Sequence, residues 1–74
     1  MSSTTDVRAM IMLNCQLSFI DLEEFCITVS IMKRGEFEVH TAYVVAGPHR
    51  VTVARASGST ANEALSNLLV ITSF

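Results

Sequence analysis

The chain has 74 residues, half of them apolar, and a net charge of −2 from seven acidic and five basic side chains. A chain of this length makes one small domain, which buries only about 60% of the surface of its unfolded chain. No apolar run approaches the ~18 residues of a membrane span, and the N-terminus lacks the basic segment of a secretory signal. The composition therefore predicts a cytoplasmic protein, not bound to a membrane, that is stabilised as a homodimer or on a protein partner.

The basic side chains are dispersed, and Lys33 and Arg34 are the one adjacent pair. Nucleic acid binding depends on clustered Lys and Arg side chains that contact phosphates. The sequence therefore disfavours nucleic acid as a partner.

The secondary structure of the N-terminal part of the chain is the hardest to predict from the sequence. Residues 1–5 are polar and unpatterned, so we expect a flexible tail there, followed by a single domain over residues 6–74. Apolar and polar residues alternate over residues 7–19, which is typical of a β-strand. The same segment contains good helix formers, and Thr5 or Asp6 could cap a helix. A strand and a helix therefore both remain possible for this segment, and the alternation favours the strand.

Alternating segments also follow further along the chain, and they predict strands over residues 25–32, 36–45 and 50–56. The glycine-containing segments 33–35 and 46–49 lie between them and predict short turns. Short turns join neighbouring strands in antiparallel fashion. The expected sheet is an antiparallel meander.

The segment from Gly58 to Ile71 predicts an amphipathic helix. Thr60 and Glu63 have the spacing of a capping box at its start. Its apolar side chains recur every three or four residues, at Ala61, Ala64, Leu65, Leu68 and Leu69. The predicted fold is α+β, a meander of three to four antiparallel strands with a C-terminal helix on one face, or α-β-β-β-α if the first segment is a helix.

No group of residues has the spacing of a catalytic, metal or nucleotide site. Cys15, Cys26, His40 and His49 form no C-x-x-C or H-x-x-x-H element, and the three glycines are isolated. The alternation places Cys26 and His40 on one sheet face, which could support nucleophilic chemistry but reads as a cross-strand polar pair. We expect no enzymatic activity, no metal and no cofactor.

The sheet face away from the helix is the expected binding surface. In the expected register it carries flexible or apolar side chains among polar ones, namely Met10, Met12, Cys26, Met32, Ala42 and Val44. Acidic residues lie on the same hairpin. The candidate protein-binding residues are Met32, Glu36, Glu38, His40 and Val44.

Three segments resemble known families. The stretch from Glu36 to Ala64, two strands and V-A-R-A-S-G-S before an alanine-bearing helix, is similar to small phage-encoded anti-CRISPR proteins, which are short, commonly acidic and act by binding. Residues 58–68 resemble the G-x-T-x-x-E-A-L-x-N segment of HicB-type antitoxins, in which a small sheet and helix bind a toxin. Residues 47–49, Gly-Pro-His, resemble part of the G-P-x-H turn of double-stranded RNA-binding domains, although here they precede a later strand.

These observations lead to one main hypothesis and two alternatives. The main hypothesis is a non-catalytic protein-binding module, a phage or mobile-element inhibitor that occludes a host protein such as a CRISPR effector in the host cytoplasm. The alternatives are an antitoxin-like or regulatory homodimer and a domain like those that bind double-stranded RNA.

Overall fold

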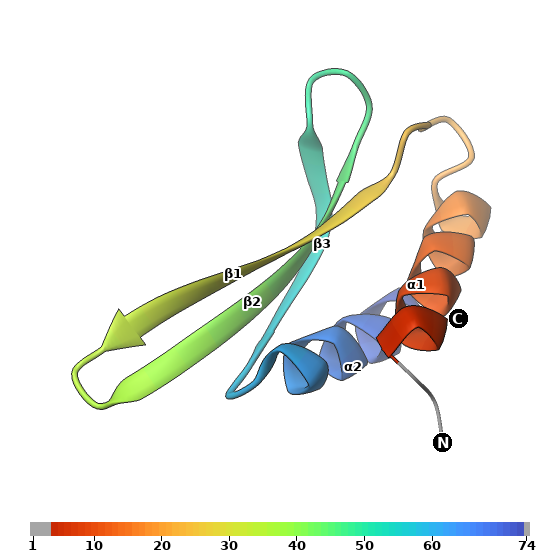
Figure 1. Ribbon diagram of the computed structural model, residues 1–74. Coiled ribbons are helices and arrows are strands. Elements are labelled where there is room, and N and C mark those ends of the chain that lie inside the picture. The colour runs from red at the N-terminus through yellow and green to blue at the C-terminus, as the bar shows by residue number, and fades with distance from the viewer. Residues whose placement is uncertain (1–3, 74) are drawn as a thin grey trace.

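The computed structural model describes residues 4–73. Its elements are, in chain order, α1 (Thr4–Ser18), β1 (Cys26–Arg34), β2 (Phe37–Ala46), β3 (Val51–Gly58) and α2 (Ala61–Thr72). The strands form one antiparallel sheet in the order β1-β2-β3, and α2 packs on one face of it (Figure 1). The predicted α+β class is therefore confirmed, in its α-β-β-β-α form.

The first segment is a helix, so the strand favoured by its alternation is wrong. Ile11 and Cys15 are one turn apart and both fully buried, with Val7 packed beside them. Met10 and Met12 occupy positions that would be polar in a half-buried strand. The apolar residues of this segment therefore fit helical spacing as well as strand alternation. The helical spacing prevails because α2 offers α1 a surface to pack against.

The flexible tail expected over residues 1–5 is only partly covered by the described residues. Thr4 and Thr5 already belong to α1, and residues 1–3 lie outside the described residues.

The two hairpins have the expected connectivity. β1 pairs with β2 from Arg34↔Phe37 to Cys26↔Val45, across a turn in which Gly35 has a φ of 60°. A glycine with positive φ as the first central residue is the requirement of a type II′ hairpin turn. β2 pairs with β3 from Ala46↔Val51 to His40↔Gly58.

The predicted cap of α2 is confirmed. The Thr60 hydroxyl accepts a hydrogen bond from the backbone N–H of Glu63 at 3.1 Å. The Glu63 carboxylate in turn accepts from the Ser59 hydroxyl at 2.9 Å and the Ser59 N–H at 3.4 Å. The start of α2 is thus fixed by its own sequence.

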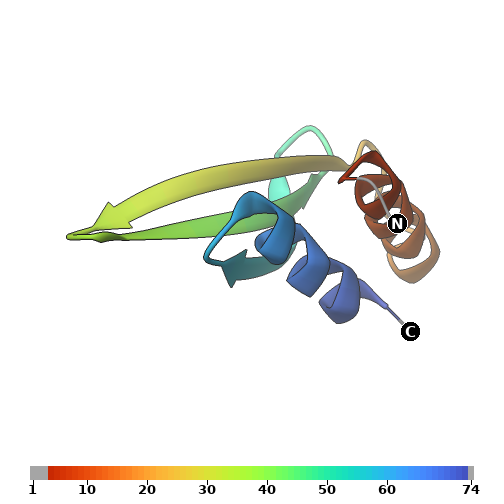
Figure 2. The same ribbon diagram turned by 60° about the horizontal axis from the view of Figure 1, so that its bottom comes forward.

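The core lies between the helices and the inner face of the sheet, and its buried members are Ile11, Cys15, Ala42, Val44, Ala56, Ala64, Leu65 and Leu68. α2 crosses β2 and β3, while α1 packs chiefly against α2 at one edge of the molecule (Figure 2). Ala42 and Val44 were expected on the uncovered face, and this is wrong because both are fully buried. Ala42 and Ala56 are small and directly opposite each other, which lets α2 approach the sheet.

Candidate protein-binding site

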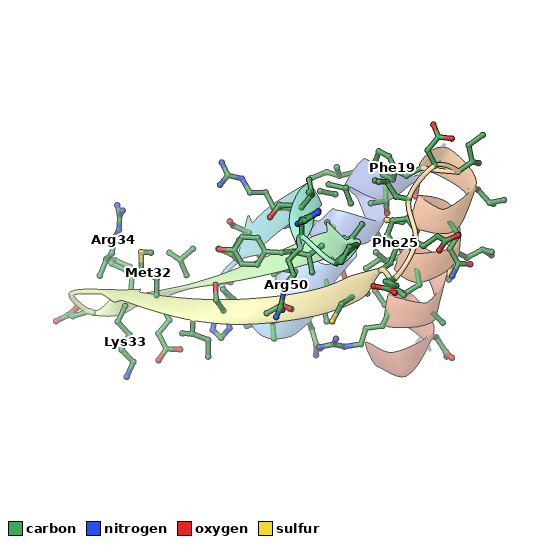
Figure 3. The ribbon with its side chains drawn as sticks, turned by 90° about the horizontal axis from the view of Figure 1, so that it is seen from above. Phe19, Phe25, Met32, Lys33, Arg34 and Arg50 are labelled. Atoms are coloured by element: carbon green, nitrogen blue, oxygen red, sulfur yellow. The ribbon has the colours of Figure 1, made fainter. Side chains whose placement is uncertain are left out.

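The β1–β2 hairpin extends beyond the rest of the molecule. β3 ends at Gly58, opposite His40, so residues 32–39 pair only with each other across the hairpin, and Ile31 pairs with His40. This two-stranded ribbon projects away from both helices (Figure 1), and Met32, Lys33 and Arg34 lie near its far end (Figure 3). We call residues 31–39 the arm and the remainder of the fold the body.

The arm carries large apolar side chains that the body does not cover. Phe37 is 76% exposed, Met32 58% and Val39 36%, and these three lie on the open face of the sheet. The register places Met32 directly opposite Val39 and Phe37 next to them along the strand. Ile31, 60% exposed, lies on the other face. The apolar surface of the arm is therefore concentrated on the open face, because Ile31 shares the other face with the charged side chains of Lys33 and Glu38.

Charged groups of both signs accompany these apolar side chains. The Lys33 ammonium lies 3.8 Å from the Glu38 carboxylate, and the Nε2 atom of His40 lies 3.4 Å from the same carboxylate. Exposed ion pairs such as Lys33–Glu38 contribute only about 0–1 kcal/mol to stability. Their carboxylate and ammonium groups stay available to a partner.

His40 lies at the base of the arm, opposite Ile31 on one side and Gly58 on the other. Its side chain is only 13% exposed, and its Nδ1 atom is buried with no hydrogen-bond partner among the described residues. A buried polar atom without a partner costs free energy. His40 thus lies at the junction of arm and body, and because its side chain is mostly buried it offers a partner little surface.

The sequence-predicted residues fall into two groups. Met32, Glu36 and Glu38 all lie on the arm and are exposed, and His40 lies at its base. Val44 has no exposed surface, so its place among the contact residues is wrong. The structure adds Phe37, Ile31 and Val39, which the sequence reasoning missed. The exposure of Phe37 could have been predicted from its place beside the hairpin turn, because a residue there lies far from any helix that packs on the middle of the sheet.

The open face of the body is more polar than expected. The Ser30 hydroxyl donates to the Tyr43 hydroxyl at 3.3 Å, and the hydroxyls of Thr41 and Ser57 lie 3.2 Å apart. These cross-strand pairs occupy the face with hydroxyl groups. The apolar part of the open face is therefore concentrated on the arm.

The thiols and imidazoles do not assemble into a reactive site. Cys26 pairs with Val45 and His40 with Ile31, which puts Cys26 and His40 on opposite faces of the sheet, so their predicted juxtaposition is wrong. Both cysteines are free, and burial raises the pKa of the Cys15 thiol. Within residues 4–73, no three His, Cys, Asp or Glu side chains come close enough to hold a metal ion.

Comparison with known proteins adds no relative: no family model, no curated protein and no solved structure matches this chain. Among the described residues, neither helix has the length and apolar character needed to cross a membrane.

Proposed function

We propose that this protein is a non-catalytic protein-binding module whose binding element is the arm. The observation that carries the proposal is the exposure of Phe37, 76%, at the end of a projecting ribbon, with Met32 and Val39 on the same face. Burying a large apolar side chain contributes about 1.5–3 kcal/mol. Since the body leaves these side chains in water, a partner protein is what can bury them.

The shape of the arm indicates how it binds. The side chains of Met32, Phe37 and Val39 share one face of the ribbon, and this face fits an apolar groove on a partner. β1 is also an outer strand of the sheet, and the backbone groups along its free edge can pair with a strand of the partner. Lys33, Arg34, Glu36 and Glu38 then form a charged rim around the buried centre.

Such a module acts by occlusion, because a ribbon bound in a groove excludes the groove's usual ligand without any chemical step. An inhibitor of a host protein, encoded by a phage or mobile element and resembling anti-CRISPR proteins, is the form of this proposal that the small size and the arm support. An antitoxin-like module would use the same arm against a toxin. The two are separated by whether the captured partner is a defence complex or a co-encoded toxin.

The test is affinity purification from an extract of the native host cells with three forms of the protein. Phe37→Thr removes the aromatic ring and keeps a strand-forming residue. Val70→Thr is the matched control, since Val70 is 73% exposed but lies on α2. We expect the wild type and Val70→Thr to retain the same amount of the partner. Phe37→Thr should retain at least about tenfold less, the order expected for an interface hot spot.

Two results would remove the proposal. One is undiminished retention by Phe37→Thr. The other is undiminished retention when both Glu36→Lys and Glu38→Lys are introduced, since reversing two charges at the rim of a true interface suppresses association.

The α-β-β-β-α layout is shared with the double-stranded RNA-binding domains, and this one observation keeps RNA as a second candidate. Retention on a duplex RNA column that falls steeply with salt would support it. Retention that is absent at low salt would eliminate it.

A further inference from the structure

The outer strand β1 has a long backbone edge with which no other strand of the described residues pairs. β1 pairs with β2 along one side and is the first strand of the sheet, so its other side is unpaired over residues 26–34. Figure 2 shows this side of β1 along the upper margin of the molecule. A row of unpaired N–H and C=O groups can pair with a further strand. We call the unpaired side of β1 the β1 edge.

The sequence of β1 leaves this edge open to pairing. Residues 26–32, Cys-Ile-Thr-Val-Ser-Ile-Met, contain no charge, no proline and no glycine, and they pair with β2 without a bulge. Proteins usually protect an outer strand with a Lys side chain, a proline or a bulge. The other outer strand, β3, has Arg55 in its middle and a register shift against β2. Of the two outer strands, β1 is therefore the one suited to pairing.

The side chains of β1 that face the helices are only partly covered. Ile27 and Val29 are half-buried and Ile31 is 60% exposed, because α2 packs on β2 and β3 and α1 barely contacts β1. No residue of β1 is fully buried. A strand added at the β1 edge would place its own side chains beside this apolar row and cover it further.

We propose that the β1 edge pairs antiparallel with the β1 edge of a second copy of this chain, about a two-fold axis at Val29. The two sheets then form one sheet of six strands. A two-fold interface uses the same surface twice, so it must be self-complementary. In this register Val29 faces Val29 of the second copy, Ile27 faces Ile31, and Thr28 faces Ser30, so side chains of the same character meet. The uncharged residues 26–32 pair over their whole length.

Charge complementarity favours the antiparallel orientation. Residues 21–24, in the turn before β1, carry three acidic side chains, whereas β1 ends with Lys33 and Arg34. Antiparallel pairing brings the basic end of each β1 to the acidic turn of the other copy, where opposite charges attract. Parallel pairing would place the two basic ends side by side. The acids of the arm, Glu36 and Glu38, lie in the turn and on β2, further from the β1 edge.

The length of the β1 edge fits a weak dimer. Seven paired residues span about 24 Å at about 3.4 Å per residue. An interface of this size lies at the weak end of the specific interfaces. We therefore expect a dimer that dissociates on dilution.

The dimer and the proposed function use different surfaces of the arm. Pairing occupies the β1 edge, while Met32, Phe37 and Val39 lie on the open face of the sheet, which stays exposed. A partner strand that pairs with β1 would compete with the second copy, whereas a partner bound to the open face would not. A monomeric protein would therefore leave the binding proposal standing, and the reverse also holds.

The first experiment measures mass by light scattering over a roughly hundredfold range of concentration, wide enough to cross the dissociation constant. The wild type should rise from the monomer mass of 8.1 kDa towards twice that value. Thr28→Lys combined with Ser30→Lys places like charges opposite each other across the two-fold axis, so the dissociation constant should rise at least about tenfold. Thr28→Glu combined with Ser30→Glu should have the same effect. An equal mixture of the two variants should dimerise again, because opposite charges then meet.

The matched control is Thr52→Lys combined with Ser57→Lys, which adds the same charges at exposed positions of β3. It should dimerise as the wild type does, and circular dichroism shows whether each variant is folded. Two results would overturn the proposal: a wild type that stays monomeric throughout, or dimerisation that is unchanged by lysines at positions 28 and 30.

The second experiment tests register and orientation with the exposed thiol of Cys26, since Cys15 is buried. In the antiparallel register Cys26 faces position 32 of the second copy. Met32→Cys should therefore form a covalent dimer with oxidised glutathione, because a disulfide needs Cα atoms within about 7 Å. The wild type, and Met32→Cys combined with Cys26→Ser, should not, because their equivalent thiols lie about 20 Å apart across the pair. Equal covalent dimers in these two controls would indicate parallel strands, and no disulfide in any sample would contradict the interface; both results overturn the proposal.

Discussion

The body and the arm share the strands β1 and β2 but differ in what lies against these strands. In β2, Ala42 and Val44 are fully buried beneath α2. Phe37 lies in the same strand, five residues before Ala42, and is 76% exposed. Backbone pairing continues through both regions. The difference shows that backbone pairing alone shapes the arm while side-chain packing stabilises the body, so the arm's large apolar side chains remain exposed.

The largest expected difference between the two regions is in the cost of truncating an apolar side chain. Leu68 is fully buried, and Leu68→Ala should lower the free energy of unfolding by about 2–5 kcal/mol. In a domain this small, that loss unfolds much of the population. Val39→Ala in the arm should cost less than about 1 kcal/mol, as surface changes do. Urea denaturation of both variants measures the contrast, and equal losses would show that the arm belongs to the packed unit.

The junction between the regions provides the next test. A Cβ atom added at Gly58 would lie 2.7 Å from the backbone nitrogen of Ala64 and 2.9 Å from the Cβ of Glu63. Gly58→Ala should therefore force α2 away from β3 and cost about 1–3 kcal/mol, the usual range for overpacking. Gly35→Ala, at the tip of the arm, meets no atom within 4 Å and is disfavoured only by its positive φ. Thermal melting should show the larger loss for Gly58→Ala, and the reverse order would contradict the close approach.

A smaller effect is expected at the start of α2. Thr60→Ala removes the hydroxyl that caps Glu63 and should cost about 1 kcal/mol. Thr60→Ser keeps the hydroxyl and should lie near wild type in the same denaturation experiment. If the serine variant were as unstable as the alanine variant, the hydrogen bond would not be the source of the effect.

The smallest effect is a pH dependence carried by Cys15. Burial raises the pKa of this thiol, so the folded state holds its proton more firmly than the unfolded state does. The corresponding stability is present below the ordinary thiol value of 9.0 and is lost as pH rises above it. Stability of the wild type should thus fall slightly above pH 9, and Cys15→Ala should remove that part of the fall. At neutral pH a thiol reagent should modify the exposed Cys26 first and reach Cys15 only on unfolding.

Much of the body could be predicted from the sequence because its signals are local. The three strands lie within two residues of their expected bounds, since turn residues such as Gly35 and Gly47 separate them. The helix α2 is fixed by Thr60 and Glu63 at its start. These features depend on neighbouring residues alone.

The features that were not predicted from the sequence depend on tertiary contacts. Residues 7–19 fit both a strand and a helix, and only the packing of Ile11 and Cys15 on α2 decides between them. Alternation in β2 also leaves both faces partly apolar, so it does not say whether Val44 or Tyr43 faces the helix. The arm itself exists because β3 ends opposite His40, a length relation between strands that no single segment encodes.

Hydrogen exchange of the free and partner-bound protein tests the central claim most directly, because it reports on arm and body together. In the free protein, amides in the arm should exchange much faster than those of β2 from Thr41 onward, which pair on both sides. Binding should slow exchange in the arm and leave the body unchanged. Protection gained in α2 or β3 while residues 31–39 stay unchanged would contradict the account.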